Sequence, residues 1–102
     1  MLELRPVCEN CEKSLPPASL EARICSFECT FCADCVERVL GGVCPNCAGG
    51  FCARPVRPVH EWCPGESLTQ YPPTEKRRVR PVDASAHRAF AERVGRVAAH
   101  ER

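Results

Sequence analysis

The sequence predicts a small zinc-stabilised α+β module, followed by a proline-rich linker and a C-terminal helix. Ten cysteines occur in 102 residues, and eight of them form four close pairs in the first half. Six prolines between Arg54 and Pro81 exclude a long helix or a central strand there. The last residues have helical composition and helical spacing of apolar side chains. We expect the module at 1–52, the linker at 53–82 and the helix at 83–102.

No signal peptide or membrane-spanning segment is expected. Glu3 and Arg5 interrupt any apolar stretch in the opening MLELRPVCEN. No later segment has the roughly 18 apolar residues of a membrane span. We therefore expect a cytoplasmic protein. Because a reducing cytoplasm keeps thiols reduced, metal binding is favoured over disulfides.

The four cysteine pairs are predicted to hold two structural Zn²⁺ ions. Two C-x-x-C pairs can place four thiolates around one ion at about 2.3 Å. A catalytic zinc keeps one position open for water, and eight cysteines for two ions leave none. Disulfides and an iron–sulfur cluster are the alternatives. The pairs are Cys8 and Cys11, Cys25 and Cys29, Cys32 and Cys35, and Cys44 and Cys47.

Spacing alone allows either sequential or interleaved pairing of these cysteines. Residues 32–40 predict a short helix that ends at Gly41 and Gly42. Its first turn would carry two cysteines on one face, where the helix dipole favours thiolates. A hairpin or loop would precede it, and we favour the interleaved arrangement. Zinc 1 would bind Cys8, Cys11, Cys32 and Cys35, and zinc 2 would bind Cys25, Cys29, Cys44 and Cys47.

The order C-x2-C, C-x3-C-x2-C-x2-C and C-P-x-C resembles a RING finger with eight cysteine ligands. In "CTFCADC", Cys29 stands where that pattern has a histidine, and Pro45 matches the closing C-P-x-C. More closely, "MLELRPVCENCEKSLPP" and "ARICSFECTFCADCVERVLGGVCPNC" resemble a family of short bacterial proteins defined as domain of unknown function 1272. The resemblance covers about residues 1–50. It implies a zinc-binding RING-like module, of cross-brace and treble-clef type, and no activity.

Ubiquitin ligation is not expected from this resemblance. Ligase RING fingers usually present an aliphatic residue between the first two ligands, where this chain has Glu9 and Asn10. They often carry an arginine after the last ligand, where this chain has Ala48. A shared fold does not transfer activity. We expect a non-enzymatic module that binds a protein partner, and the sequence identifies neither that partner nor the oligomeric state.

Charge is distributed unevenly along the chain. Residues 1–52 hold four Lys/Arg and seven Asp/Glu, net −3, whereas residues 53–102 hold ten and six, net +4. Four thiolates around Zn²⁺ carry −2, so two sites make the module strongly negative and repel phosphate. A nucleic-acid-associated or transcriptional regulator acting through the tail is therefore a second, less favoured hypothesis. Its basic run is Lys76, Arg77, Arg78 and Arg80.

The remaining cysteines and histidines are expected to lie outside the metal sites. Cys52 and Cys63 are expected to be free thiols, with a partial third site including His60 as the alternative. A thiol redox or zinc-responsive protein is accordingly the third functional hypothesis. His60, His87 and His100 are all expected at the surface.

Two further expectations concern apolar residues. Phe27 and Phe31 are expected to pack around the metal sites. Asp83 or Ser85 should cap the C-terminal helix, which Gly95 weakens. The narrow apolar stripe of this helix suits packing on a partner or on itself rather than on a membrane, and consists of Phe90, Val94, Val97 and Ala98.

Overall fold

The first two strands form a β-hairpin whose turn carries two cysteines. In the computed structural model, which describes residues 1–102, β1 (Ala22–Ile24) pairs antiparallel with β2 (Thr30–Cys32). The turn between them is closed by the N–H of Cys25, which donates to the carbonyl of Cys29 at 3.2 Å. The predicted hairpin or loop before the helix is thus a hairpin, and both of its thiols lie in the turn.

Helix α1 (Ala33–Arg38) follows β2 without a break. Cys32 is its N-cap, and its Sγ accepts a hydrogen bond from the N–H of Cys35 at 3.4 Å. The helix stops because Gly41 and Gly42 take left-handed φ angles of 58° and 75°, which side chains rarely tolerate. The short helix predicted before the glycine pair is confirmed.

A third strand completes a small sheet. β3 (Cys52–Ala53) pairs antiparallel with β1, so the strand order is β2-β1-β3. Phe31 of β2 is buried and meets the ring of Phe51 edge to face, with ring centroids 5.6 Å apart. The chain is therefore a small α+β fold, as predicted, with a core made largely of cysteines and a few apolar side chains.

Phe27 does not join this core, contrary to the expectation. Its side chain is 72 % exposed. It lies in the turn between Cys25 and Cys29, two residues whose side chains are buried. Because the turn directs those two thiols inward, the residue between them points outward.

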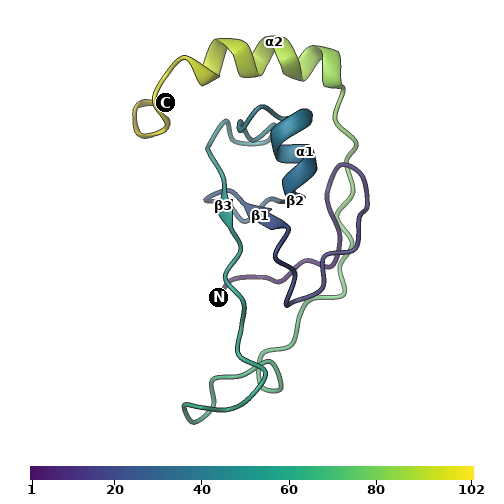
Figure 1. The fold of residues 1–102 in the computed structure, drawn as a ribbon, viewed down its shortest axis with the longest axis vertical. Helices are drawn as coiled ribbons and strands as arrows, with labels where there is room; N and C mark the ends of the chain where they lie inside the picture. The colour runs from purple at the N-terminus through teal and green to yellow at the C-terminus, as the bar shows by residue number, and fades with distance from the viewer.

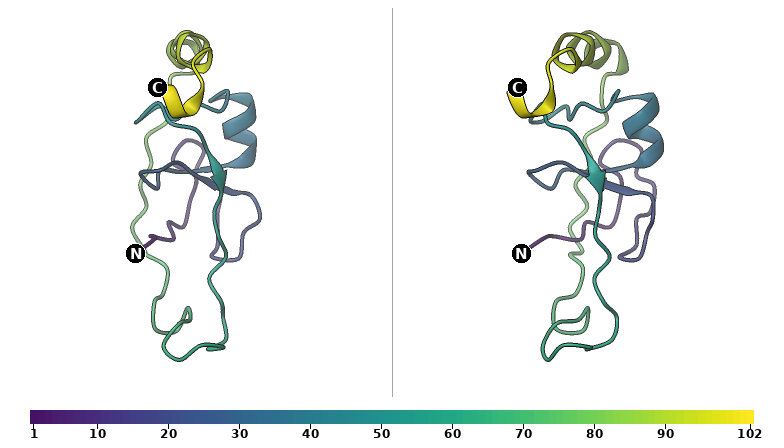
Figure 2. Two further views of the ribbon diagram at one scale, coloured as in Figure 1. Left: turned by 90° about the vertical axis from the view of Figure 1, so that its left-hand side faces the viewer. Right: turned by 60° about the vertical axis from the view of Figure 1, so that its left-hand side comes forward.

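After β3 the chain forms a long irregular segment, residues 54–83, which we call the excursion and which returns to the module. Figure 1 shows it descending to a loop at the bottom, then rising along the opposite side to α2 (Ala84–Gly95), which lies across the top; Figure 2 shows the same path from two other directions. No helix or strand occurs between Ala53 and Ala84, as the prolines require. None of the helices combines the length and the apolarity needed to span a bilayer.

Arg54 ties the start of this excursion to the N-terminal segment. Its guanidinium is buried and donates to the carbonyls of Arg5 at 2.8 Å, Leu15 at 3.1 Å and Pro16 at 3.0 Å. Burial lowers the pKa of Arg54 from its usual value. The contacts that hold the module together therefore extend beyond residue 52.

Helix α2 rests on the module through a buried histidine. Asp83 caps the helix, accepting hydrogen bonds from the N–H groups of Ser85 and Ala86. His87 is only 5 % exposed, and its Nε2 lies 2.9 Å from the carbonyl oxygen of Leu40. The expectation of a surface histidine is therefore wrong for His87, because α2 folds back onto the end of α1. After Gly95 a short 3-10 turn, η1 (Ala99–Glu101), ends the chain.

Candidate metal centre

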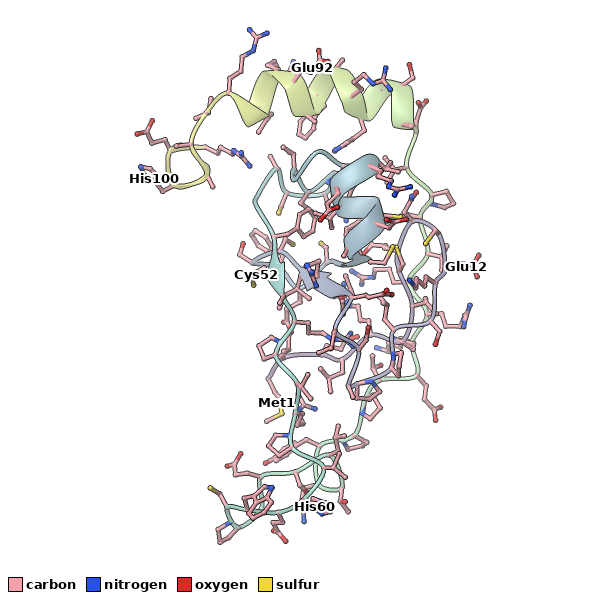
Figure 3. All side chains as sticks on the ribbon, viewed as in Figure 1. Met1, Glu12, Cys52, His60, Glu92 and His100 are labelled. Carbon is pink, nitrogen blue, oxygen red and sulfur yellow. The ribbon has the colours of Figure 1, made fainter.

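Four thiols converge beside the first turn of α1. The sulfur atoms of Cys8, Cys11, Cys32 and Cys35 all lie within 4.8 Å of one another. Two come from a loop near the N-terminus and two from the N-terminal end of the helix. In Figure 3 sulfur atoms gather between α1 and the loop that carries Glu12. All of these cysteines are buried except Cys11, which is exposed.

A second group forms on the other side of the hairpin. The sulfur atoms of Cys25, Cys44 and Cys47 lie within 4.8 Å of one another. Cys29 is buried at the other end of the same hairpin turn. The structure thus brings Cys25 of the hairpin to the 44/47 pair and the helix cysteines to the 8/11 pair, whereas the predicted fourth ligand, Cys29, is not part of its group. This grouping is interleaved along the chain rather than sequential.

The two C-x-N-C loops have the same backbone fold. We call residues 8–13 the N-terminal knuckle and residues 44–49 the C-terminal knuckle. In each, the N–H of the first cysteine donates to the carbonyl five residues later, at 2.9 Å and 2.8 Å. In each, the residue after the second cysteine has a left-handed φ, 63° at Glu12 and 67° at Ala48. The same loop is therefore built twice, once for each cysteine group.

Backbone N–H groups point at several of these sulfurs. Sγ of Cys25 accepts from the N–H of Phe27 and Sγ of Cys47 from that of Gly49, each at 3.4 Å. Such donors stabilise a thiolate and orient it toward a common centre. Burial, meanwhile, raises the pKa of Cys35 and of Cys44, because a charged sulfur in an apolar site loses its hydration. A bound divalent cation would offset that cost, so the donor set fits a thiophilic metal such as zinc.

Cys52 and Cys63 are exposed and belong to neither group. Figure 3 shows Cys52 beside the sheet and His60 in the loop at the bottom, so the two do not come together. The alternative of a third site is therefore not assembled in this structure. His60 and His100 are exposed, as expected.

Exposure predicts an order of thiol reactivity. Cys52 and Cys63 should react first with a maleimide at neutral pH, because nothing covers them. Among the paired cysteines, Cys11 should react first as metal is withdrawn, because it is the exposed member of its group. Time-resolved labelling followed by peptide mass spectrometry measures this order. Early labelling of Cys44, which is buried, would contradict the structure.

The basic run of the tail faces acidic residues of the module. Nη2 of Arg77 lies 3.0 Å from Oε2 of Glu12. Nη2 of Arg80 lies 3.9 Å from Oε1 of Glu9, whose side chain is only 2 % exposed. The charges that the sequence divides between two halves thus meet in space. Two of the four basic residues already have carboxylate partners within the chain.

Sequence reasoning missed the polar residues around the thiols. Nδ2 of Asn10 donates to Sγ of Cys35 at 3.3 Å, and Nδ2 of Asn46 donates to Oε1 of Glu9 at 2.8 Å. A signal for both was present, because asparagine occupies the same place in the two knuckles. Arg54 left no comparable signal, since its partners lie 38 to 49 residues away in the sequence.

Comparison with known proteins places the chain in a family. A protein of Rhizobium meliloti (strain 1021), named only as uncharacterised, is 49 % identical over 89 residues, which cover 87 % of this chain and 99 % of that protein. No solved structure matches the chain. The family model described as "Protein of unknown function (DUF1272)" matches residues 1–57, which include all eight paired cysteines. The chain therefore belongs to the DUF1272 family.

Proposed function

We propose that the chain is a non-enzymatic interaction module whose fold is held by two zinc ions, one in each cysteine group. The observation that carries the proposal is the cluster of four thiols within 4.8 Å at the start of α1. Zinc 1 would bind Cys8, Cys11, Cys32 and Cys35. Zinc 2 would bind Cys25, Cys44 and Cys47, with Cys29 as the fourth ligand. The interleaved order of the pairs supports a RING-like cross-brace.

The size of the module explains why metal would be needed. A piece of about fifty residues buries too little apolar surface to be safely stable alone. Structural zinc contributes roughly 10–16 kcal/mol in comparable peptides. Four thiolates per ion close the coordination shell, so the metal would support the fold and bind no substrate. Zinc would thus act as part of the core, and the cell's cytoplasm would keep its ligands reduced.

The exposed apolar residues support a role in binding another protein. Val56, Val59 and Trp62 are all at least half exposed in the lower part of the excursion. Exposed aromatic and aliphatic side chains of this kind are typical of protein interfaces. Nucleic-acid binding through the tail is less favoured, because Arg77 and Arg80 pair with Glu12 and Glu9.

Native mass spectrometry of the full-length protein tests the metal part of this proposal. Two zinc ions per chain are expected, and one or none would refute the two-site assignment. The variant Cys29→Ser should bind fewer than two zinc ions, because its proposed site loses a thiolate. The matched control is Cys52→Ser, which removes an exposed thiol outside both groups and should retain two ions.

A further inference from the structure

A short piece of the tail crosses both knuckles on its way to α2. We call residues 80–82 the strap; it is part of the segment that rises along one side in Figure 1. The N–H of Arg80 donates to the carbonyl of Glu9 at 2.7 Å, and the N–H of Val82 donates to Oδ1 of Asn10 at 2.8 Å. Both partners lie between Cys8 and Cys11. The strap is therefore bound to the loop that supplies half of the first cysteine group.

Asn10 contacts the strap and a cysteine sulfur with opposite ends of one amide. Its Oδ1 accepts from Val82, and its Nδ2 donates to Sγ of Cys35 at 3.3 Å. An amide nitrogen can only donate and an amide oxygen can only accept. The side chain therefore satisfies both partners in a single orientation. The sulfur of Cys35 and the strap are thus linked through two hydrogen bonds of the Asn10 side chain.

Asn46 makes the corresponding link in the C-terminal knuckle. Its Nδ2 donates to Oε1 of Glu9 at 2.8 Å, and its Oδ1 accepts from Nη2 of Arg80 at 3.4 Å. Asn46 therefore contacts the strap directly, from its place between Cys44 and Cys47. Glu9, 2 % exposed, thus joins the two knuckles to the same strap residue.

We propose that Asn10, with Asn46 supporting the strap, is a positioning residue that couples metal loading of the first cysteine group to docking of the strap and α2. This inference rests on the zinc assignment proposed above. A hydrogen bond to a metal-bound thiolate is stronger than one to a neutral thiol, so loading fixes the amide of Asn10 in the orientation that the strap needs. By reciprocity, a docked strap holds this amide in place and raises metal affinity.

Helix α2 and the strap dock weakly on the module, so metal loading can change how much of the protein has them docked. An open pocket of about 340 Å³ lies between α2, the strap and the C-terminal knuckle, lined in part by Asn46, His87 and Phe90. The contacts of the helix with the module include the polar contact of His87 with Leu40 and the close approach of Ala91 to Gly41. Elements with few buried apolar contacts open at low free-energy cost. Loss of metal would therefore release α2 and expose the end of α1.

The test uses the full-length zinc-loaded protein and two readouts. Zinc affinity is measured by competition with a chromophoric chelator, and docking by hydrogen exchange of the α2 amides. Asn10→Ala should lower zinc affinity by about 10- to 100-fold, as removal of such supporting groups commonly does, and Asn46→Ala should weaken the docking of the strap, because it removes the acceptor of Arg80. Both should also accelerate exchange in α2. The matched control is Gln70→Ala, which removes an amide in the bottom loop that contacts Glu61 and no cysteine.

Reciprocity supplies the decisive variant. Asp83→Ala removes the cap of α2 and touches no cysteine, yet it should lower zinc affinity measurably while accelerating exchange in α2. In the double variant Asn10→Ala/Asp83→Ala the two losses of affinity should not add, because the same coupling is removed twice. Unchanged zinc affinity in Asp83→Ala, or full additivity, would overturn the coupling. A wild-type protein that binds no zinc would instead refute the proposed function itself.

Discussion

Replacing Cys44 by serine is expected to unfold the part of the chain that the proposed zinc ions would stabilise. Cys44 has no exposed surface, lies in the second cysteine group, and its N–H donates to the carbonyl of Gly49 at 2.8 Å. Serine keeps the shape of the side chain but removes the thiolate. Because a structural zinc contributes roughly 10–16 kcal/mol and a fold of this size has only about 5 kcal/mol to lose, a weakened site exceeds the margin.

Circular dichroism and proton NMR of the full-length variant, in the presence of zinc, measure this effect. Loss of amide dispersion and a fall in bound metal should occur together. Cys52→Ser is the control, since that thiol is exposed and outside both groups. A Cys44→Ser protein that keeps wild-type dispersion and stability would show that metal does not hold the fold.

Arg54→Leu should be the most destabilising substitution outside the cysteines. It would leave the buried carbonyls of Arg5, Leu15 and Pro16 without their donor. Each unbonded buried polar group costs about 1–3 kcal/mol, so a total loss of roughly 3 kcal/mol or more is expected. Arg54→Lys should recover only part of it, because one ammonium cannot reproduce the planar fork of donors.

Urea unfolding with excess zinc gives the free energy of unfolding for these variants. Arg78→Leu is a suitable control, because its side chain is exposed and the substitution removes the same charge. If Arg54→Leu and Arg78→Leu change the free energy of unfolding by the same small amount, the three carbonyls do not depend on Arg54. Zinc content measured in parallel separates loss of this cluster from loss of metal.

Local features of the fold were accessible from the sequence. The paired cysteines fixed where the chain turns, and the glycine pair at 41 and 42 ended α1 because both positions need a left-handed backbone. Asp83 capped α2 through two neighbouring N–H groups, a contact of two and three residues in sequence. Each of these depends on residues close together in the chain, which is where propensity and spacing are informative.

Long-range contacts were not accessible in the same way. The burial of His87 depends on α2 lying over the end of α1, 47 residues earlier in the chain. Arg54 looked like the first residue of a linker, yet its position beside β3 brings it to carbonyls near the N-terminus. The sequence shows asparagine at the same place in both knuckles, but the hydrogen bonds of Asn10 and Asn46 to the strap form only because the strap returns to the knuckles. The sequence contains no local signal for a return of the chain after twenty-five irregular residues.

That return gives the excursion two fixed ends. Arg54 anchors its start to the N-terminal segment, and Arg80 anchors its finish to Glu9. Arg57 also donates to the carbonyl of Leu2, and Arg77 pairs with Glu12, so residues 58–76 form a closed loop attached to the module at both ends, with no thiol of either group inside it. Loop-closure entropy changes slowly with length, by about 0.6 kcal/mol for each doubling. This loop is thus the place where related chains can lengthen, shorten or exchange sequence, and where a tag or a new binding segment can be inserted without disturbing either cysteine group.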